Sequence, residues 1–274
     1  PPTPPASTDK TYTVGGISFT MKGIAAVTNG SVGDNSQSDN NVHKASLTAY
    51  RIGETEVTQE LWQAVMGDNP SWFKSSPDGS EVQAKRPVER VSWYDCIAFC
   101  NELTKKVPEL GESQCVYTVD GHTYGTTDAT AKKEPAMDMN KKGFRLPTEA
   151  EWEWAAMGGK DYKWSGTNEL VQLINYAWYN ANSGNKTHEV KQKQANGYGL
   201  YDMSGNVWEW CWDWYDTLPN PLPEDYSGAA SGRYRVLRGG SWDVIAEYCV
   251  VGVRSVSYPD CSNVLLGFRL ALRP

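Results

Sequence analysis

Several features are scarce or missing in this 274-residue chain, and each absence narrows the class of protein. No run of 18 or more apolar residues occurs, so no segment is expected to span a membrane. Basic residues are in the minority, with a net charge of −7 and a pI near 5.1, which argues against nucleic acid as a partner. The six cysteines form no CxxC pair, so a zinc knuckle is not expected.

The cysteines are Cys96, Cys100, Cys115, Cys211, Cys249 and Cys261. Cys96 and Cys100 stand four apart in a helical pattern, a spacing that rarely gives a good disulfide. We therefore expect buried free thiols. Phenylalanine is also scarce, at 5 residues against 12 tryptophans and 15 tyrosines. Such amphipathic rings need a hydrogen-bond partner at one edge, which suits an irregular, loop-rich fold better than an aliphatic helical bundle.

Residues 1–10 read PPTPPASTDK, a composition typical of an extended linker. Linkers of this kind often follow an export signal or a lipid anchor. We therefore expect a secreted or cell-surface protein, lipid-anchored through a segment outside this sequence; the alternative is a trimmed cytosolic enzyme. No inter-domain linker is seen within 11–274, which predicts a single domain.

The element pattern predicts an α+β fold. Residues 11–25 alternate as paired strands around a Gly-Gly turn, residues 27–45 are turn-rich and predict a loop, and Asp120-Gly121 predicts a hairpin. Three helices are expected: from Thr58 to Gly67, from about Trp93, and from Thr148 to Gly158. In the last, Thr148 and Glu151 form a capping box. Acidic residues there are expected to serve the cap and the helix dipole.

Long motifs spread over the chain resemble the formylglycine-generating enzyme (sulfatase-modifying factor) superfamily. They are ETEVTQELW at 54–62, PVERVSWYDCIAFC at 87–100, RLPTEAEWEWAA at 145–156, GLYDMSGNVWEWCWDW at 199–214, RVLRGGSW at 235–242 and GFRLAL at 267–272. The resemblance implies a C-type-lectin-like fold, with two helices on a small twisted antiparallel sheet and much irregular structure. Function does not follow from the fold, and three classes compete within this superfamily.

The first class is the copper-dependent oxidase, in which, as the resemblance implies, two cysteines near the C-terminus bind the copper ion. Cys249 falls on the second of these, but Val244 falls on the first, and valine offers copper no ligand. The second class, iron-dependent oxidases, needs a histidine cluster, whereas His43, His122 and His188 are isolated and are expected to be exposed loop residues. We therefore expect no copper and no enzymatic activity, with an oxidase of this superfamily as the alternative.

The third class comprises binding proteins whose C-terminal region is diversified by a retroelement, and it fits residues 238–272. Ordinary members of the superfamily are rich in asparagine here. In relatives diversified by a retroelement, adenines are mutated, so that AAY asparagine codons become any NNY codon. NNY codons cannot encode Lys, Glu, Gln, Met or Trp. None of these five occupies the varied positions that we assign to ligand binding, and we add Val253 from the same stretch. The expected ligand-binding residues are Asp243, Val244, Ile245, Tyr248, Val253, Ser255, Val256, Ser257, Tyr258, Cys261, Ser262, Asn263, Val264 and Leu265.

Tyrosine and serine in this stretch suit a contact surface, and its aliphatic side chains lose little entropy on burial by a partner. The expected partner of this monomeric protein is a protein or glycan ligand. The alternative is that VVGVRSVSY at 250–258 is a buried strand, because its residues alternate in a strand-like way.

The resemblance also implies a structural calcium ion at the loop YDMSGNVWEW. Carried over, the ligands are the carboxylates of Asp202 and Glu209 and the backbone carbonyls of Gly205 and Val207. The alternative is that Glu209 and Asn206 only satisfy buried loop amides. No ion is expected at the superfamily's other calcium loop, which corresponds to NYAWYNANSGNKTHEV here.

Overall fold

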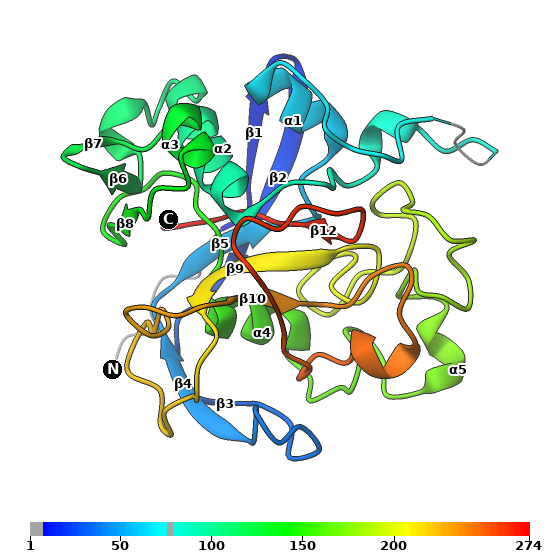
Figure 1. The fold of residues 1–274 in the computed structure, drawn as a ribbon. Helices are drawn as coiled ribbons and strands as arrows, with labels where there is room; N and C mark the ends of the chain where they lie inside the picture. Colours follow the sequence, from blue (N-terminus) through cyan, green and yellow to red (C-terminus); the bar gives the residue numbers. More distant parts are fainter. Residues whose placement is uncertain (1–7, 76–78) are drawn as a thin grey trace.

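A computed structural model describes residues 8–75 and 79–274 of the chain (Figure 1). Two four-stranded sheets lie at its centre. The first has the order β1-β2-β5-β13 and is antiparallel; its strands are Lys10–Val14, Ile17–Ile24, Tyr50–Gly53 and Ala271–Leu272. The second has the order β11-β10-β9-β12, with strands Ser255–Ser257, Arg235–Arg238, Trp208–Trp214 and Leu266–Gly267. In it β12 runs parallel to β9, so the final residues of the chain join both sheets.

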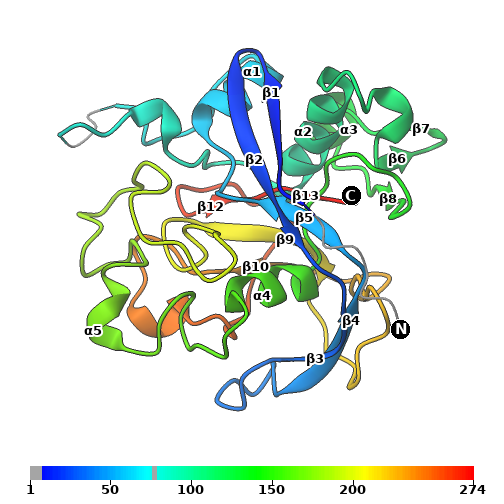
Figure 2. The same ribbon diagram turned by 180° about the vertical axis from the view of Figure 1, so that it is seen from behind.

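Helices cover these sheets from both sides, as Figures 1 and 2 show. The three longest are α1 (Gln59–Met66), α2 (Trp93–Lys106) and α4 (Glu149–Met157), and α3 (Thr126–Thr130) and α5 (Leu170–Leu173) are short. Smaller sheets complete the fold: β3 (Val27–Val32) with β4 (His43–Leu47), and β6 (Tyr117–Val119) between β7 (His122–Thr123) and β8 (Ala136–Met137). The α+β, lectin-like architecture expected from the sequence is confirmed. None of the helices in the described ranges has the length and apolar character that a membrane crossing requires.

Local sequence signals for the helices and turns were accurate. Thr58 accepts a hydrogen bond at the start of α1, and Gly67 ends that helix at φ 90°. Thr148 and Glu151 form the expected capping box of α4. Asp120 and Gly121 form the two-residue turn between β6 and β7, both at positive φ.

The prediction of a loop at 27–45 was wrong, because β3 and β4 form a hairpin there. Buried residues recur at every second position along β4, as in a half-buried strand. The strand is so short, and its surroundings so rich in turn residues, that the sequence pattern did not reveal it. Of the expected linker, residues 1–7 lie outside the described residues. Thr8 and Asp9 already contact the first sheet, through Arg51 and Lys22, and Lys10 begins β1.

Buried ion pairs tie α4 to distant parts of the chain. Glu151 pairs with Arg145 through two bonds of 2.6 Å, Glu153 pairs with Arg238, and Glu149 pairs with Arg254 at 2.7 and 2.8 Å. All six residues are buried. A fourth pair joins Glu209 of β9 to Arg269 at 2.6 and 2.7 Å. In three of the pairs the carboxylate meets its arginine in two-pronged geometry, which fixes orientation as well as distance; Arg238 instead divides its donors between Glu153 and the Val253 carbonyl.

We predict that Glu151→Gln lowers the free energy of unfolding by about 3–5 kcal/mol, because it leaves the buried Arg145 charge uncompensated. The matched control is Glu102→Gln, which breaks the partly exposed Lys105–Glu102 pair on α2 and should cost under about 1 kcal/mol. Urea unfolding followed by circular dichroism measures both. Equal losses in the two variants would contradict the assigned role of the buried pair.

Candidate ligand-binding surface

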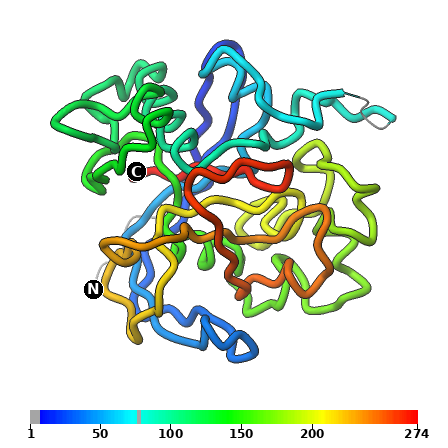
Figure 3. Tube along the Cα trace, viewed as in Figure 1, coloured from blue at the N-terminus to red at the C-terminus, as the bar shows by residue number. Residues whose placement is uncertain are grey.

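The C-terminal segment between RGGSW and GFRLAL is held at both ends by buried framework residues. It runs along one side of β9 and β10 and returns to the sheet at β11 and β12, as Figures 1 and 3 show in orange to red. Arg238 and Arg269, its two boundary arginines, are 0% exposed. Position 240 requires glycine: its φ is 80°, and a Cβ there would lie 2.8 Å from the Cys249 sulfur. The Trp242 indole N–H donates to the Val264 carbonyl at 3.1 Å and ties the two arms of the segment together.

Within this frame five of the fourteen expected ligand-binding residues are exposed and eight are half-buried. Ile245, Tyr248 and Tyr258 are 48%, 53% and 44% exposed, and Asp243 and Ser262 are exposed as well. The remaining positions are half-buried: Val244, Ser255, Val256, Ser257, Cys261, Asn263, Val264 and Leu265. We call these thirteen residues, from Asp243 to Leu265, the ledge. Exposed aromatic and aliphatic groups on a fixed backbone are features of an interaction surface.

Val253 does not belong to the ledge, and the structure corrects its assignment. Its side chain is 7% exposed and packs in the core with Val250, while Val251 is also buried. The alternative of a buried segment is therefore right for residues 250–253. The chain turns outward only after Arg254, whose pairing with Glu149 fixes that point.

Two residues outside the segment join the ledge at Tyr258, and sequence reasoning missed them. The Arg233 guanidinium donates to the Tyr258 hydroxyl at 2.6 Å, and the Tyr234 hydroxyl lies 3.3 Å from it. The hydrogen bond from Tyr234, followed by the nearby positive charge of Arg233, lowers the pKa of Tyr258. Arg233 and Tyr234 precede β10, and only its pairing with β11 brings them beside the ledge.

The four expected calcium ligands do not form a cation site. Both carboxylate oxygens of Glu209 accept from Arg269, and one also accepts from the Trp152 indole at 2.6 Å, so an arginine occupies the place of a cation. Burial raises the pKa of Asp202 to about 6, and one of its carboxylate oxygens accepts from the Lys191 backbone N–H at 3.0 Å.

The alternative interpretation fits Asn206, which bonds a buried backbone amide, but not Glu209, whose donors are Arg269 and Trp152. The Asn206 amide donates to Glu56 at 2.7 Å, and its oxygen accepts from the His188 backbone at 3.0 Å. No group of three or more potential metal ligands is found among residues 8–75 and 79–274. No role for calcium is therefore derived.

Cys249, which falls on the second copper-ligand position of the resemblance, is 0% exposed, and burial raises the pKa of its thiol to about 12. All six cysteines are free, as expected. The expectation of exposed histidines was wrong for His43 and His188, which are 5% and 7% exposed; His122 does lie at the surface.

Comparisons with known proteins agree with this architecture. A family model described as "Sulfatase-modifying factor enzyme 1-like domain" matches residues 2–274. The chain is 37% identical over 249 residues to "Chaperone protein LppX" of Paenibacillus barcinonensis, covering 82% of this chain and 77% of that protein. It is 39% identical over 237 residues to the formylglycine-generating enzyme of Thermomonospora curvata, covering 78% of this chain and 64% of that enzyme.

Among solved structures, "Treponema denticola variable protein 1" matches with a TM-score of 0.90 and 55% sequence identity. The match covers 97% of this chain and 99% of that one. The structure titled "Structure of PvdO from Pseudomonas aeruginosa" shares the fold, with a TM-score of 0.67 at 20% identity; it covers 93% of this chain and 94% of that one.

We predict that the ledge tolerates replacement whereas the adjoining core does not. Changing Ile245, Tyr248, Val256 and Tyr258 together to asparagine should cost under about 2 kcal/mol of unfolding free energy, because surface changes cost about 0.5 kcal/mol each. The single change Val253→Asn should lower the unfolding free energy more than the four changes together, because it places an amide in the core without a hydrogen-bond partner. Urea unfolding of both variants checks the order, and its reversal would contradict the surface assignment.

Proposed function

The chain belongs to the sulfatase-modifying factor enzyme 1-like family, and within this family we propose that it binds a ligand through the ledge and catalyses no reaction. Its likeness to a structure titled a variable protein supports a scaffold of that kind. The observation that carries the proposal is the contrast along one segment. Ile245, Tyr248 and Tyr258 face solvent, while the framework arginines at both ends are buried in ion pairs.

The ledge suits recognition by shape and apolar contact. Tyrosine and aliphatic side chains supply contact area at a low entropic cost, and the serines beside them supply adaptable hydrogen bonds. Asp243, Glu247 and Asp260 are exposed among them, so a partner with basic groups around an apolar centre is complementary. We propose a protein or glycan surface as the ligand, bound by a monomer at the cell surface or outside the cell. The name of the LppX relative is consistent with a lipid anchor, which stays part of the proposal.

We further propose that the ledge is diversified by a retroelement that rewrites adenines of the coding segment. The physical requirement is a backbone whose path does not depend on the residues being changed. Main-chain bonds of the segment go to the framework: Val251 N–H donates to the Lys163 carbonyl at 2.8 Å, and Asn180 N–H donates to the Val244 carbonyl at 3.0 Å. Neither bond uses a ledge side chain.

The genomic prediction is direct. An adenine-rich near-copy of the segment that encodes residues 238–272 should lie near this gene, beside a gene for a reverse transcriptase. Its mismatches with the gene should fall on ledge codons and spare those of Arg238, Arg254 and Arg269. Sequencing this locus in several isolates of the source organism tests the prediction. Identical ledge codons in all isolates, together with no such near-copy, would count against diversification.

The alternative of a copper-dependent oxidase makes an opposite prediction. Incubation with copper and a sulfatase-type cysteine peptide should give no formylglycine, because Val244 stands where a second thiolate is required and the Cys249 thiol is buried. Mass spectrometry of the peptide detects the aldehyde product, and a family enzyme assayed in parallel serves as the positive control. Turnover by this protein would overturn the proposed function.

A further inference from the structure

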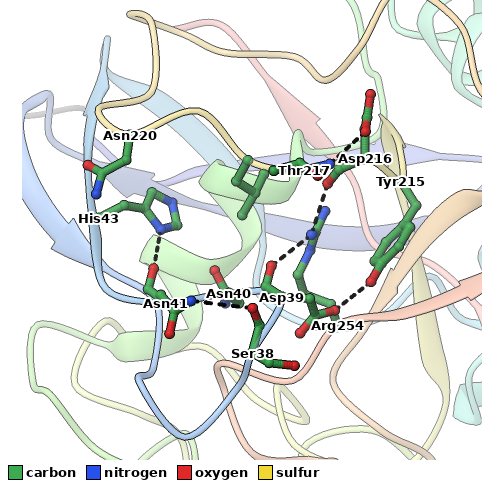
Figure 4. A pocket seen from close by; sticks show the side chains of 11 residues that line it. Ser38, Asp39, Asn40, Asn41, His43, Tyr215, Asp216, Thr217, Asn220 and Arg254 are labelled. Carbon is green, nitrogen blue, oxygen red and sulfur yellow. Dashed lines mark hydrogen bonds between the residues drawn. The ribbon is translucent and has the colours of Figure 1, made fainter.

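A polar pocket of about 530 Å³ lies between the loop 38–43 and the loop 215–220 (Figure 4). Figure 4 shows His43 and Asn220 at one end and Tyr215 and Arg254 at the other. No ledge residue lines it, so this site is distinct from the ledge and independent of the function proposed above. Arg254 joins its two walls, because one guanidinium nitrogen donates to the carbonyls of Asp39 and Asp216 at 3.0 and 3.1 Å.

Internal bonds fix the shape of the loop 38–43. The His43 Nδ1–H donates to the Asn41 carbonyl at 2.8 Å, and the Asn41 amide donates to the Ser38 carbonyl at 3.3 Å. The Asn40 amide nitrogen donates to Glu153 and to the Gly252 carbonyl. The pocket is therefore built on the same buried network that holds α4.

The groups left over in the pocket are hydrogen-bond acceptors. The Asn40 side-chain oxygen is buried without a partner, in a residue that is 1% exposed. The His43 Nδ1–H is used by the Asn41 carbonyl, and its Nε2 has no partner in the described part of the chain. One oxygen of Asp39 accepts from the Tyr215 hydroxyl at 2.7 Å, and within the described residues the other is unbonded.

The charge of the lining is negative. Asp39 and Asp216 contribute two carboxylates, and the one arginine present is neutralised by Glu149 at 2.7 and 2.8 Å. A suitable ligand therefore donates several hydrogen bonds and carries positive charge. A primary ammonium has three N–H donors and meets both conditions.

We propose that this pocket binds a lysine side chain of a protein partner. The ammonium donates to the unbonded carboxylate oxygen of Asp39, and the four-carbon stem packs against Leu218 and the Tyr215 ring, which line the same space. Lysine is favoured over an amino sugar, because the sugar's remaining hydroxyls would face this apolar part of the lining.

The test is an NMR titration of the full chain with Nα-acetyl-L-lysine N-methylamide. We expect saturable shifts of signals from Asn40, Asn41 and His43, and about tenfold weaker binding of the neutral norleucine analogue, which lacks the charge-assisted bonds. The substitution Asp39→Asn should lower the affinity for the lysine probe about tenfold, since it removes the charged acceptor. The control Glu112→Gln removes an exposed carboxylate outside the pocket and should change binding by less than about twofold.

Three results would overturn the proposal: equal affinity for the norleucine analogue, unchanged binding by a folded Asp39→Asn variant, or tighter binding of glucosamine than of the lysine probe. Thermal unfolding establishes that the Asp39 variant is folded. The fourfold asparagine variant of the ledge should bind the lysine probe unchanged, so the pocket and the ledge are tested separately.

Discussion

The structure depends on buried ion pairs between arginine and glutamate. Two carboxylates of the nine-residue helix α4 bind arginines that are far away in the sequence, a third binds Arg145 just before the helix, and the fourth pair joins β9 to GFRLAL. Charges buried in this way are costly to desolvate, and their geometry must be nearly ideal to repay the cost. Once formed, they leave the backbone at each arginine little freedom. Arg238, Arg254 and Arg269 therefore mark the start, middle and end of a segment whose path is set by the framework.

This constraint explains how polar anchors and an apolar, irregular stretch coexist in one short segment. Between Arg238 and Arg254 the chain buries Cys249, Val250, Val251 and Val253, which supply the local core. Tyr248 is exposed in the same stretch, because the short 3-10 turn Ala246–Cys249 buries its two end residues and exposes its two middle ones; Ile245, just before the turn, is exposed as well. The exposed residues contribute little to the fold and are free to serve recognition. A surface of this kind suits a binding protein, since variation at its exposed positions leaves the frame intact.

The likeness to formylglycine-generating enzymes shows how one fold serves different chemistry. In this chain one expected copper ligand is a valine and the other is a thiol whose pKa burial raises to about 12. The loop from which the resemblance implied calcium binding is closed by Arg269 and Glu56 instead. Internal ion pairs and amide bonds order this half of the molecule.

The family resemblance, the α+β class and the boundaries of α1 and α4 could be predicted from the sequence, because caps, glycine stops and long motifs act over a few residues. The sequence also located the ledge as a segment, since composition changes sharply between RGGSW and GFRLAL. It misjudged Val253, the β3–β4 hairpin and two histidines, because burial depends on neighbours far away in the sequence. Only the tertiary structure could place Arg233 and Tyr234 beside Tyr258, commit Glu209 to Arg269, and enclose a pocket between loops that lie some 170 residues apart. Those arrangements arise from long-range pairing and from competition for buried partners, neither of which leaves a periodic signal in a single chain.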